Sequence, residues 1–195
     1  MKVIFLDNDG VICLDNNWGG RTRKFEKYRK LHPETMNLSQ VDVFHRFDNF
    51  DKKAIKVLND ILTLTGAEIV VSSDWKKHAT LEELGDYYES QGIIKRPVAL
   101  TPSFNDCEKP TDFTLSFFTR YEQERSVEIM QYLKDNPDVT HWVAVDDLNM
   151  CYDIVYTDGE EDIQPWGLKN FVYTPRMAEG IKQSGKKEEI IKFLI

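Results

Sequence analysis

The sequence has few cysteines, no long apolar run and no excess of positive charge, and each absence argues against a class of protein. Its three cysteines, Cys13, Cys107 and Cys151, are scattered without metal-ligand spacing, which argues against a disulfide framework or zinc site and favours a cytoplasmic protein with reduced thiols. No run of about 18 apolar residues occurs and no apolar leader precedes the first predicted strand, so no membrane span, signal peptide or membrane partner is expected. The formal net charge of −8 argues against broad, non-specific adhesion to nucleic acid.

Alternating strand-like and helix-like segments predict an α/β fold with a mainly parallel sheet and helices on both faces. Short apolar runs predict strands at 3–6, 68–71, 97–101, 142–145 and 171–173. Helical spacing of apolar residues predicts helices at 22–31, 51–66, 81–92, 118–135 and 188–195. In the fourth of these, the predicted core positions are Val127, Ile129, Met130 and Leu133. The 195 residues form a single predicted domain, 1–195, and the acidic segment 158–162 is interpreted as a solvated loop.

Polar residues capable of chemistry follow three of these predicted strands. They are Asp7 and Asp9 after the first, Ser72 and Ser73 after the second, and Asp146 and Asp147 after the fourth. Parallel neighbouring strands would bring all three sets to one sheet edge, where α/β proteins bind ligands. Clustered carboxylates repel and require a cation, and oxygen ligands without cysteine or histidine favour Mg²⁺. Each residue is also a common helix N-cap or turn former, a reading that explains the sites singly but not the recurring pairs of carboxylates.

These segments resemble the haloacid dehalogenase (HAD) superfamily of phosphohydrolases. An apolar strand followed by Asp7-Asn8-Asp9-Gly10 resembles its first motif, IVVSSDW at Ser72 its second, and VAVDD at Asp146 and Asp147 its fourth. Together with the segments ALTP and RSVEIMQYL, the sequence is most similar to small HAD domains related to those of RNA-repair polyproteins. The resemblance implies a Rossmann-like three-layer sandwich over nearly the whole chain.

The resemblance also implies roles for these residues. Asp7 would attack phosphorus to form an aspartyl-phosphate, and Asp9 would act as general acid and then general base. The metal site would comprise Asp7, Asp9 through its backbone carbonyl, Asp146, and Asp147 as the residue that orients a metal-bound water. Ser72 and Ser73, with nearby backbone amides, would bind phosphoryl oxygens.

In the HAD superfamily a third motif contributes a lysine or arginine that neutralises the phosphate and the nucleophile. This sequence has more than one candidate for that residue. Arg125, in the predicted helix before EIMQYL, is the first choice for neutralising the phosphate, and Lys109 in the preceding loop is the second. An arginine in a helix is also often simply solvated. Lys76 and Lys77 after SSDW are a further source of positive charge, and Trp75 is interpreted as packing, with substrate stacking as the alternative.

A small insertion at 16–50 is predicted to form a flap over the site. It contains a basic run from Arg21 to Lys30, which is either a solvated helix face or a surface that attracts an anionic substrate. A small flap leaves room for bulky substrates. The sequence therefore predicts a Mg²⁺-dependent phosphomonoesterase acting on a phosphorylated small molecule, a nucleotide or a nucleic-acid end. A phosphotransferase with the same intermediate and a non-catalytic phospho-ligand binder are the alternatives, and no oligomeric state is indicated.

Overall fold

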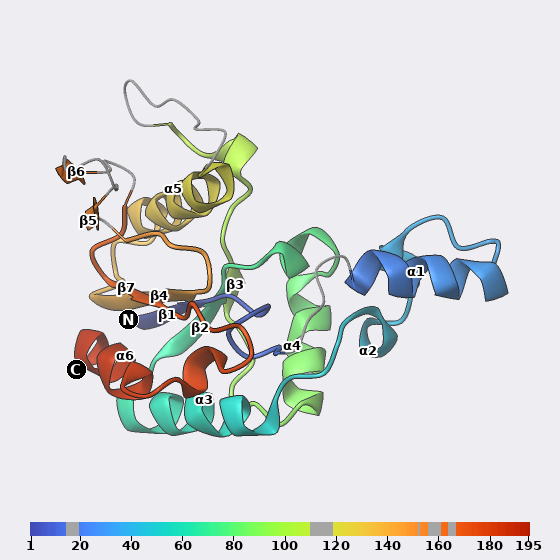
Figure 1. Ribbon diagram of the computed structural model, residues 1–195, viewed down its shortest axis with the longest axis horizontal. Coiled ribbons are helices and arrows are strands. Elements are labelled where there is room, and N and C mark those ends of the chain that lie inside the picture. The colour runs from blue at the N-terminus through green and yellow to red at the C-terminus, as the bar shows by residue number, and fades with distance from the viewer. Residues whose placement is uncertain (15–19, 110–118, 152, 156–160, 164–166) are drawn as a thin grey trace.

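A five-stranded, entirely parallel sheet forms the centre of the computed structural model (Figure 1). The structure describes residues 1–14, 20–109, 119–151, 153–155, 161–163 and 167–195. In spatial order the strands are β3 (Ala99–Leu100), β2 (Glu68–Val71), β1 (Lys2–Leu6), β4 (His141–Asp146) and β7 (Phe171–Tyr173). The predicted parallel α/β sheet and its five strands are confirmed, with β1 at the centre.

Both faces of the sheet are covered, which explains the continuous apolar run of β1. Because successive side chains of a strand point to opposite faces, Ile4 and Leu6 lie in one core and Val3 and Phe5 in the other. The first core contains residues of α3 (Lys52–Thr65), α4 (Leu81–Ser90) and α6 (Lys186–Leu194). The second contains residues of α5 (Arg120–Asp135), which lies across the sheet from α3 and α6 in Figure 1. This arrangement is the Rossmann-like three-layer sandwich that the resemblance implies.

The ends of α3 illustrate why the sequence predicts these helices well. Asp51 caps the first turn by accepting hydrogen bonds from the amides of Lys53 and Ala54, at 2.9 and 2.8 Å. Gly66 ends the helix in the left-handed conformation, with φ of 69°. Within the described part of the chain, no helix combines the length and apolar character needed to cross a bilayer.

The predicted insertion contains α1 (Gly20–Leu31), the 3-10 turn η1 (Leu38–Gln40) and α2 (Val43–Arg46), and its first residues, 16–19, lie outside the described part of the chain. Figure 1 shows α1 and α2 at the edge of the molecule, beyond α4. Arg46 is buried and bonds to the carbonyl of Val41 at 2.7 Å and to Glu83 of α4 at 3.0 Å. The end of the insertion is thus fixed to α4, and its action as a flap stays a prediction.

Part of the acidic segment differs from its interpretation as a loop. Residues Glu161–Ile163 form β6, which pairs antiparallel with β5 (Asp153–Val155), while 158–160 lie outside the described residues. The loop interpretation was therefore wrong for Glu161 and Asp162. Because acidic residues are depleted in strands, the composition of this segment did not indicate a strand. The pairing of β5 with β6 depends on backbone hydrogen bonds.

Three further 3-10 turns complete the described elements. They are η2 (Asp74–Lys77), η3 (Phe104–Asp106) and η4 (Gly180–Lys182). The first of them directly follows β2 and Ser72-Ser73, so it lies at the sheet edge where the predicted site residues gather.

Candidate active site

The register of the sheet places the predicted site residues side by side. Leu6 of β1 pairs with Val71 of β2 and with Val145 of β4. The next residue of β1, Asp7, therefore lies between Ser72 and Asp146 at the carboxyl edge of the sheet. The amide of Asp7 donates to the carbonyl of Val145 at 3.1 Å, and the amide of Ser72 donates to the carbonyl of Leu6 at 2.9 Å. The predicted meeting of three strand ends is thus observed in the backbone.

A tight loop after β1 makes room for the side chain of Asp147. The carbonyl of Asn8 accepts hydrogen bonds from the amides of Ile12 and Cys13, at 3.0 and 2.8 Å. Gly10 has φ of 71°, and a Cβ at this position would overlap the carboxylate of Asp147. Glycine is required here both by its backbone conformation and by the close approach of that side chain.

Three carboxylates form a cluster with the spacing of metal ligands. One oxygen from each of Asp7, Asp146 and Asp147 lies within 4.8 Å of the others, and Asp7 and Asp146 are buried. Mg²⁺ prefers oxygen ligands of this kind, and a divalent cation would relieve the repulsion among the three carboxylates. The residues therefore fit the metal that the sequence predicts. The carboxylate of Asp9 is outside this cluster, and the predicted contribution of its backbone carbonyl stays a prediction.

Arg125 of α5 reaches into the cluster. Its Nη1 lies 2.9 Å from Oδ1 of Asp7 and 2.8 Å from Oδ2 of Asp146, and its Nη2 lies 3.7 Å from Oδ1 of Asp74. Although burial opposes its charge, the carboxylates of Asp146 and Asp7 hold the pKa of Arg125 well above the ordinary value. The first choice for the basic residue of the third motif thus contacts the predicted nucleophile.

Lys109, the second choice, has different partners. Its ammonium group donates to the carbonyls of Phe104 at 2.6 Å and Cys107 at 2.8 Å, and lies 4.5 Å from the centre of the Phe104 ring. Through these contacts the ammonium group of Lys109 stabilises its own loop, which follows β3. The geometry therefore favours Arg125 for neutralising charge at Asp7.

The carboxylates of the cluster titrate abnormally because they are buried together. Burial raises the pKa of Asp7 and raises that of Asp146 well above its usual range, while Arg125 opposes both shifts. Burial and the charge of Asp7 raise the pKa of Asp147 to about 7. Proton uptake by this cluster therefore competes with metal binding near neutral pH.

The metal-free protein is expected to lose thermal stability as the pH rises from about 4 to about 7. A carboxyl group whose folded pKa is raised stabilises the protein below its unfolded pKa of 3.8, and this contribution disappears as the pH passes the folded value of about 7. The loss should not exceed about 1.4 kcal/mol per pH unit for one group. Thermal melts in a metal chelator at several pH values measure the slope. Asp147→Asn should flatten it, and an unchanged slope would contradict the assignment.

Ser72 and Ser73 have different environments. The Oγ of Ser72 is buried and has no hydrogen-bond partner among the residues that the structure describes, although Ser72 adjoins Asp7 in the sheet. A buried hydroxyl without a partner is costly unless a ligand completes it, which fits a phosphoryl oxygen. The side chain of Ser73 hydrogen bonds with the carboxylate of Asp7 and lowers its pKa. The structure thus places Ser73 against Asp7, the predicted nucleophile, and the phosphate contacts of both serines stay a prediction.

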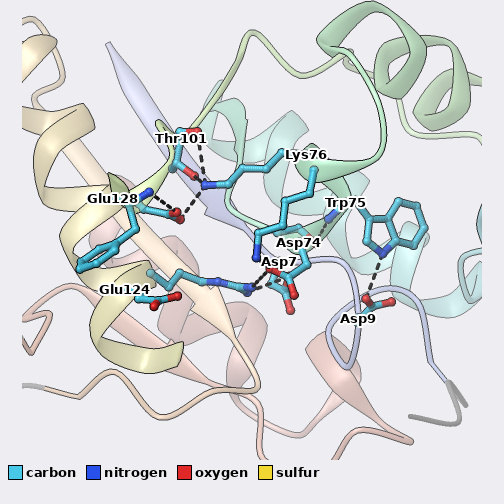
Figure 2. A network of polar contacts seen from close by, with 12 residues as sticks. Asp7, Asp9, Asp74, Trp75, Lys76, Thr101, Glu124 and Glu128 are labelled. Atoms are coloured by element: carbon cyan, nitrogen blue, oxygen red, sulfur yellow. Dashed lines mark hydrogen bonds and ion pairs between the residues drawn. The ribbon is translucent and has the colours of Figure 1, made fainter. Parts of the chain in front are cut away.

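Residues of η2 make contacts that sequence reasoning missed, and Figure 2 shows them. Nε1 of Trp75 donates to Oδ2 of Asp9 at 3.0 Å. Lys76, considered above as a charge near the site, donates to Oε2 of Glu128 at 2.6 Å and to Oγ1 of Thr101 at 2.8 Å. The only signal in the sequence was the position of Trp75 and Lys76 directly after Ser72-Ser73-Asp74.

The buried ion pair of Lys76 and Glu128 supports Arg125. Both side chains are at least nine-tenths buried, and Glu128 lies one helical turn after Arg125 on α5. Glu128 also accepts from the amide of Phe104 at 2.9 Å. The pair therefore fixes the turn of α5 that carries Arg125 against the carboxyl edge of the sheet.

Comparison with known proteins identifies a family for this chain. The chain matches, over residues 3–183, the family described as the HAD domain in Swiss Army Knife RNA repair proteins. No curated protein and no solved structure matches it. The match includes the strand ends that carry Asp7, Ser72 and Asp146, as well as Arg125. Because it covers nearly all of the sequence, the chain belongs to the family of HAD domains of Swiss Army Knife RNA repair proteins.

Proposed function

We propose that this protein is a Mg²⁺-dependent phosphomonoesterase that acts through an aspartyl-phosphate. The observation that carries the proposal is the arrangement around Asp7, whose carboxylate lies within the three-carboxylate cluster and 2.9 Å from the guanidinium of Arg125. A nucleophilic carboxylate must approach an anionic phosphate, so positive charge at this point is the chief requirement of the reaction. The membership in a HAD family supports the same chemistry.

Each residue of the proposed site has a separate role in the reaction. Asp7 attacks phosphorus, and Asp9 gives a proton to the leaving oxygen and then takes one from the water that hydrolyses the aspartyl-phosphate. Ser72 holds a phosphoryl oxygen with its buried hydroxyl, and Arg125 balances the charge of Asp7 and the phosphate. Asp7, Asp146 and Asp147 are the residues that would hold Mg²⁺. A bound Mg²⁺ supplies electrostatic stabilisation of the transferring phosphoryl group.

Release of inorganic phosphate tests the proposal directly. The protein is incubated with Mg²⁺ or with a chelator against phosphometabolites, nucleotides and oligonucleotides with terminal phosphates. Mg²⁺-dependent release supports the phosphomonoesterase. Transfer of the phosphate to an acceptor other than water would identify a phosphotransferase with the same intermediate. Binding without release or transfer across the panel would contradict catalysis and favour a phospho-ligand binder.

The substrate we propose is a nucleotide or nucleic-acid terminal phosphate, on the basis of α1. Those of its basic side chains that the structure describes are exposed, and Glu26 is the one acidic residue in the sequence of the helix, on a protein of net charge −8. The basic residues whose side chains the structure describes are Arg23, Lys24, Lys27, Arg29 and Lys30. Lys24 connects the helix to the core, because its ammonium donates to the carbonyl of Phe47 at 2.9 Å. A local basic surface of this kind suits a phosphate backbone.

Reversing the charge of α1 should therefore weaken the use of oligonucleotides selectively. In the triple variant Lys27→Glu, Arg29→Glu, Lys30→Glu, we expect KM for a terminally phosphorylated oligonucleotide to rise about tenfold or more at low salt. The kcat for para-nitrophenyl phosphate should be unchanged.

A control with the same change in net charge distinguishes local contacts from the overall charge. Lys52, Lys53 and Lys192 are exposed on α3 and α6, and their joint replacement by glutamate should alter KM much less. Equal effects of the two triple variants would remove α1 from the proposed binding surface.

A further inference from the structure

One polar contact of Asp9 bears on how a proton reaches the leaving group. Nε1 of Trp75 donates to Oδ2 of Asp9 at 3.0 Å (Figure 2). Trp75 is 1% exposed, so bulk water does not compete for its N–H. An indole N–H is a donor only, and its acceptor must present a lone pair. In this contact Trp75 must therefore be the donor and Asp9 the acceptor, whereas a hydroxyl or water in the same place could take either role.

The ring of Trp75 is held by aromatic side chains from the end of the insertion. It stacks on Phe47 with ring centres 4.0 Å apart and planes 5° apart, and on Phe50 at 5.4 Å. The edge of Tyr87 of α4 packs at 5.7 Å. Neighbouring Arg46 anchors this part of the insertion to α4 through Glu83, as described above. A ring enclosed in this way has one orientation, and so does its N–H.

We infer that Trp75 is the positioning residue for Asp9, a role that rests on the proposed phosphomonoesterase function. When Asp9 is neutral, the N–H of Trp75 favours the form with the carbonyl oxygen at Oδ2, because a carbonyl oxygen is a stronger hydrogen-bond acceptor than a protonated carboxyl oxygen. The acidic proton is then on Oδ1. The indole thus selects which oxygen of Asp9 delivers the proton and fixes the plane of the carboxyl group. This function is additional to the packing interpretation of Trp75.

The proton balance of both steps follows from this assignment. As Asp7 forms its bond to phosphorus, the bond from phosphorus to the leaving oxygen breaks, and Oδ1 of Asp9 gives its proton to that oxygen. Asp9 is then a carboxylate with Oδ2 still hydrogen bonded to Trp75. In the second step Oδ1 takes a proton from the attacking water as the water oxygen forms its bond to phosphorus. The bond from phosphorus to the Asp7 oxygen breaks, which releases phosphate and restores the Asp7 carboxylate.

The inference predicts a dependence on the leaving group that a purely structural role lacks. A basic alkoxide leaves only with a proton, whereas para-nitrophenolate leaves readily without one. Trp75→Phe preserves an aromatic ring for Phe47 but removes the donor. We expect kcat/KM to fall about tenfold or more for a nucleoside monophosphate, and by no more than about threefold for para-nitrophenyl phosphate.

The matched control is Trp142→Phe. Trp142 lies at the start of β4, where its ring packs against Phe5 at 5.9 Å, at the opposite end of the strand from Asp146. This variant should retain the wild-type ratio between the two substrates. A substituted phenyl phosphate series gives the full dependence on leaving-group basicity for each variant.

A double-mutant cycle with Asp9→Asn isolates the coupling. If Trp75 acts through Asp9, the Trp75→Phe change should cost little further activity for the nucleoside monophosphate once Asp9 is replaced. Multiplicative losses, or an equal loss with both substrates in the single variant, would overturn the positioning role. Absence of phosphatase activity in the wild-type protein would instead overturn the proposed function, so the two failures are distinguishable.

An NMR measurement tests the hydrogen bond without relying on activity or on one variant's folding. The four tryptophans give four indole ¹⁵N–¹H signals, and Asp9→Ala should shift the Trp75 signal upfield while leaving that of Trp142 in place. Phe47→Leu offers a second approach, because it keeps the indole but removes its stacking partner. It should lower activity in the same substrate-selective direction. If the chemical shift of the Trp75 indole signal were unchanged in Asp9→Ala, the inference would also be overturned.

Discussion

Asp7→Asn is expected to abolish Mg²⁺-dependent phosphate release, lowering kcat by at least about a thousandfold, in a protein that stays folded. The amide has the shape of the carboxylate but cannot attack phosphorus. Burial raises the pKa of Asp7, so the folded protein already disfavours its charge, and the neutral amide should not reduce the melting temperature of the metal-free protein. Phosphate release from para-nitrophenyl phosphate and thermal melts measure the two effects.

Asp60→Asn is the matched control for this substitution. Asp60 is on α3, where it pairs with Lys56 at 3.1 Å and Lys187 at 2.8 Å, and it belongs to no part of the proposed site. Its replacement should leave kcat unchanged. Full activity of Asp7→Asn would rule out nucleophilic catalysis by this residue.

The intermediate itself can be sought in the Asp9→Asn variant. With para-nitrophenyl phosphate the first step needs no acid, but hydrolysis of the aspartyl-phosphate loses its general base. Phosphorylated protein should therefore accumulate and be visible by intact-protein mass spectrometry. The double variant Asp7→Asn, Asp9→Asn should show none. Phosphorylation that persists in the double variant would locate the nucleophile elsewhere.

The location of the site could be predicted because it depends on backbone geometry alone. Because Leu6 pairs in parallel with Val71 and Val145, the residues that directly follow these three must lie side by side. This holds for any packing of their side chains. Asp7, Ser72 and Asp146 could therefore be brought together from the order of apolar runs and the residues that end them. Arg125, the residue that the geometry favours for the third motif, comes from a helix on one face of the sheet, and the sequence left two candidates for this role.

Contacts that depend on side-chain packing could not be predicted in the same way. The hydrogen bond of Trp75 to Asp9 joins residues far apart in sequence and depends on how Phe47 confines the indole. The spacing of apolar residues also gave a wrong assignment of buried and exposed positions in part of α5. Met130 was predicted as core but is 39% exposed, whereas Glu128 is buried. The inward face of this helix carries charged residues with buried partners, which a hydrophobic pattern assigns to the surface.

Arg125→Met is expected to have two large effects with a common cause. It removes the positive charge between Asp7 and Asp146, so kcat/KM should fall about a hundredfold to a thousandfold. It also leaves two buried carboxylates without their counter-charge, which should destabilise the metal-free protein by about 3–5 kcal/mol at neutral pH. Added Mg²⁺ should restore part of this stability, because a cation bound to the same carboxylates replaces the missing charge.

Lys109→Met is the comparison that decides between the two candidates for the basic residue. Its ammonium donates to carbonyl oxygens of the 104–107 loop, so its loss should leave kcat/KM for para-nitrophenyl phosphate unchanged. A larger loss of activity in Lys109→Met than in Arg125→Met would transfer the role to the lysine. Arg125→Lys should be intermediate, because an ammonium keeps the charge but lacks the planar fork that reaches Asp7 and Asp146 through one nitrogen and Asp74 through the other.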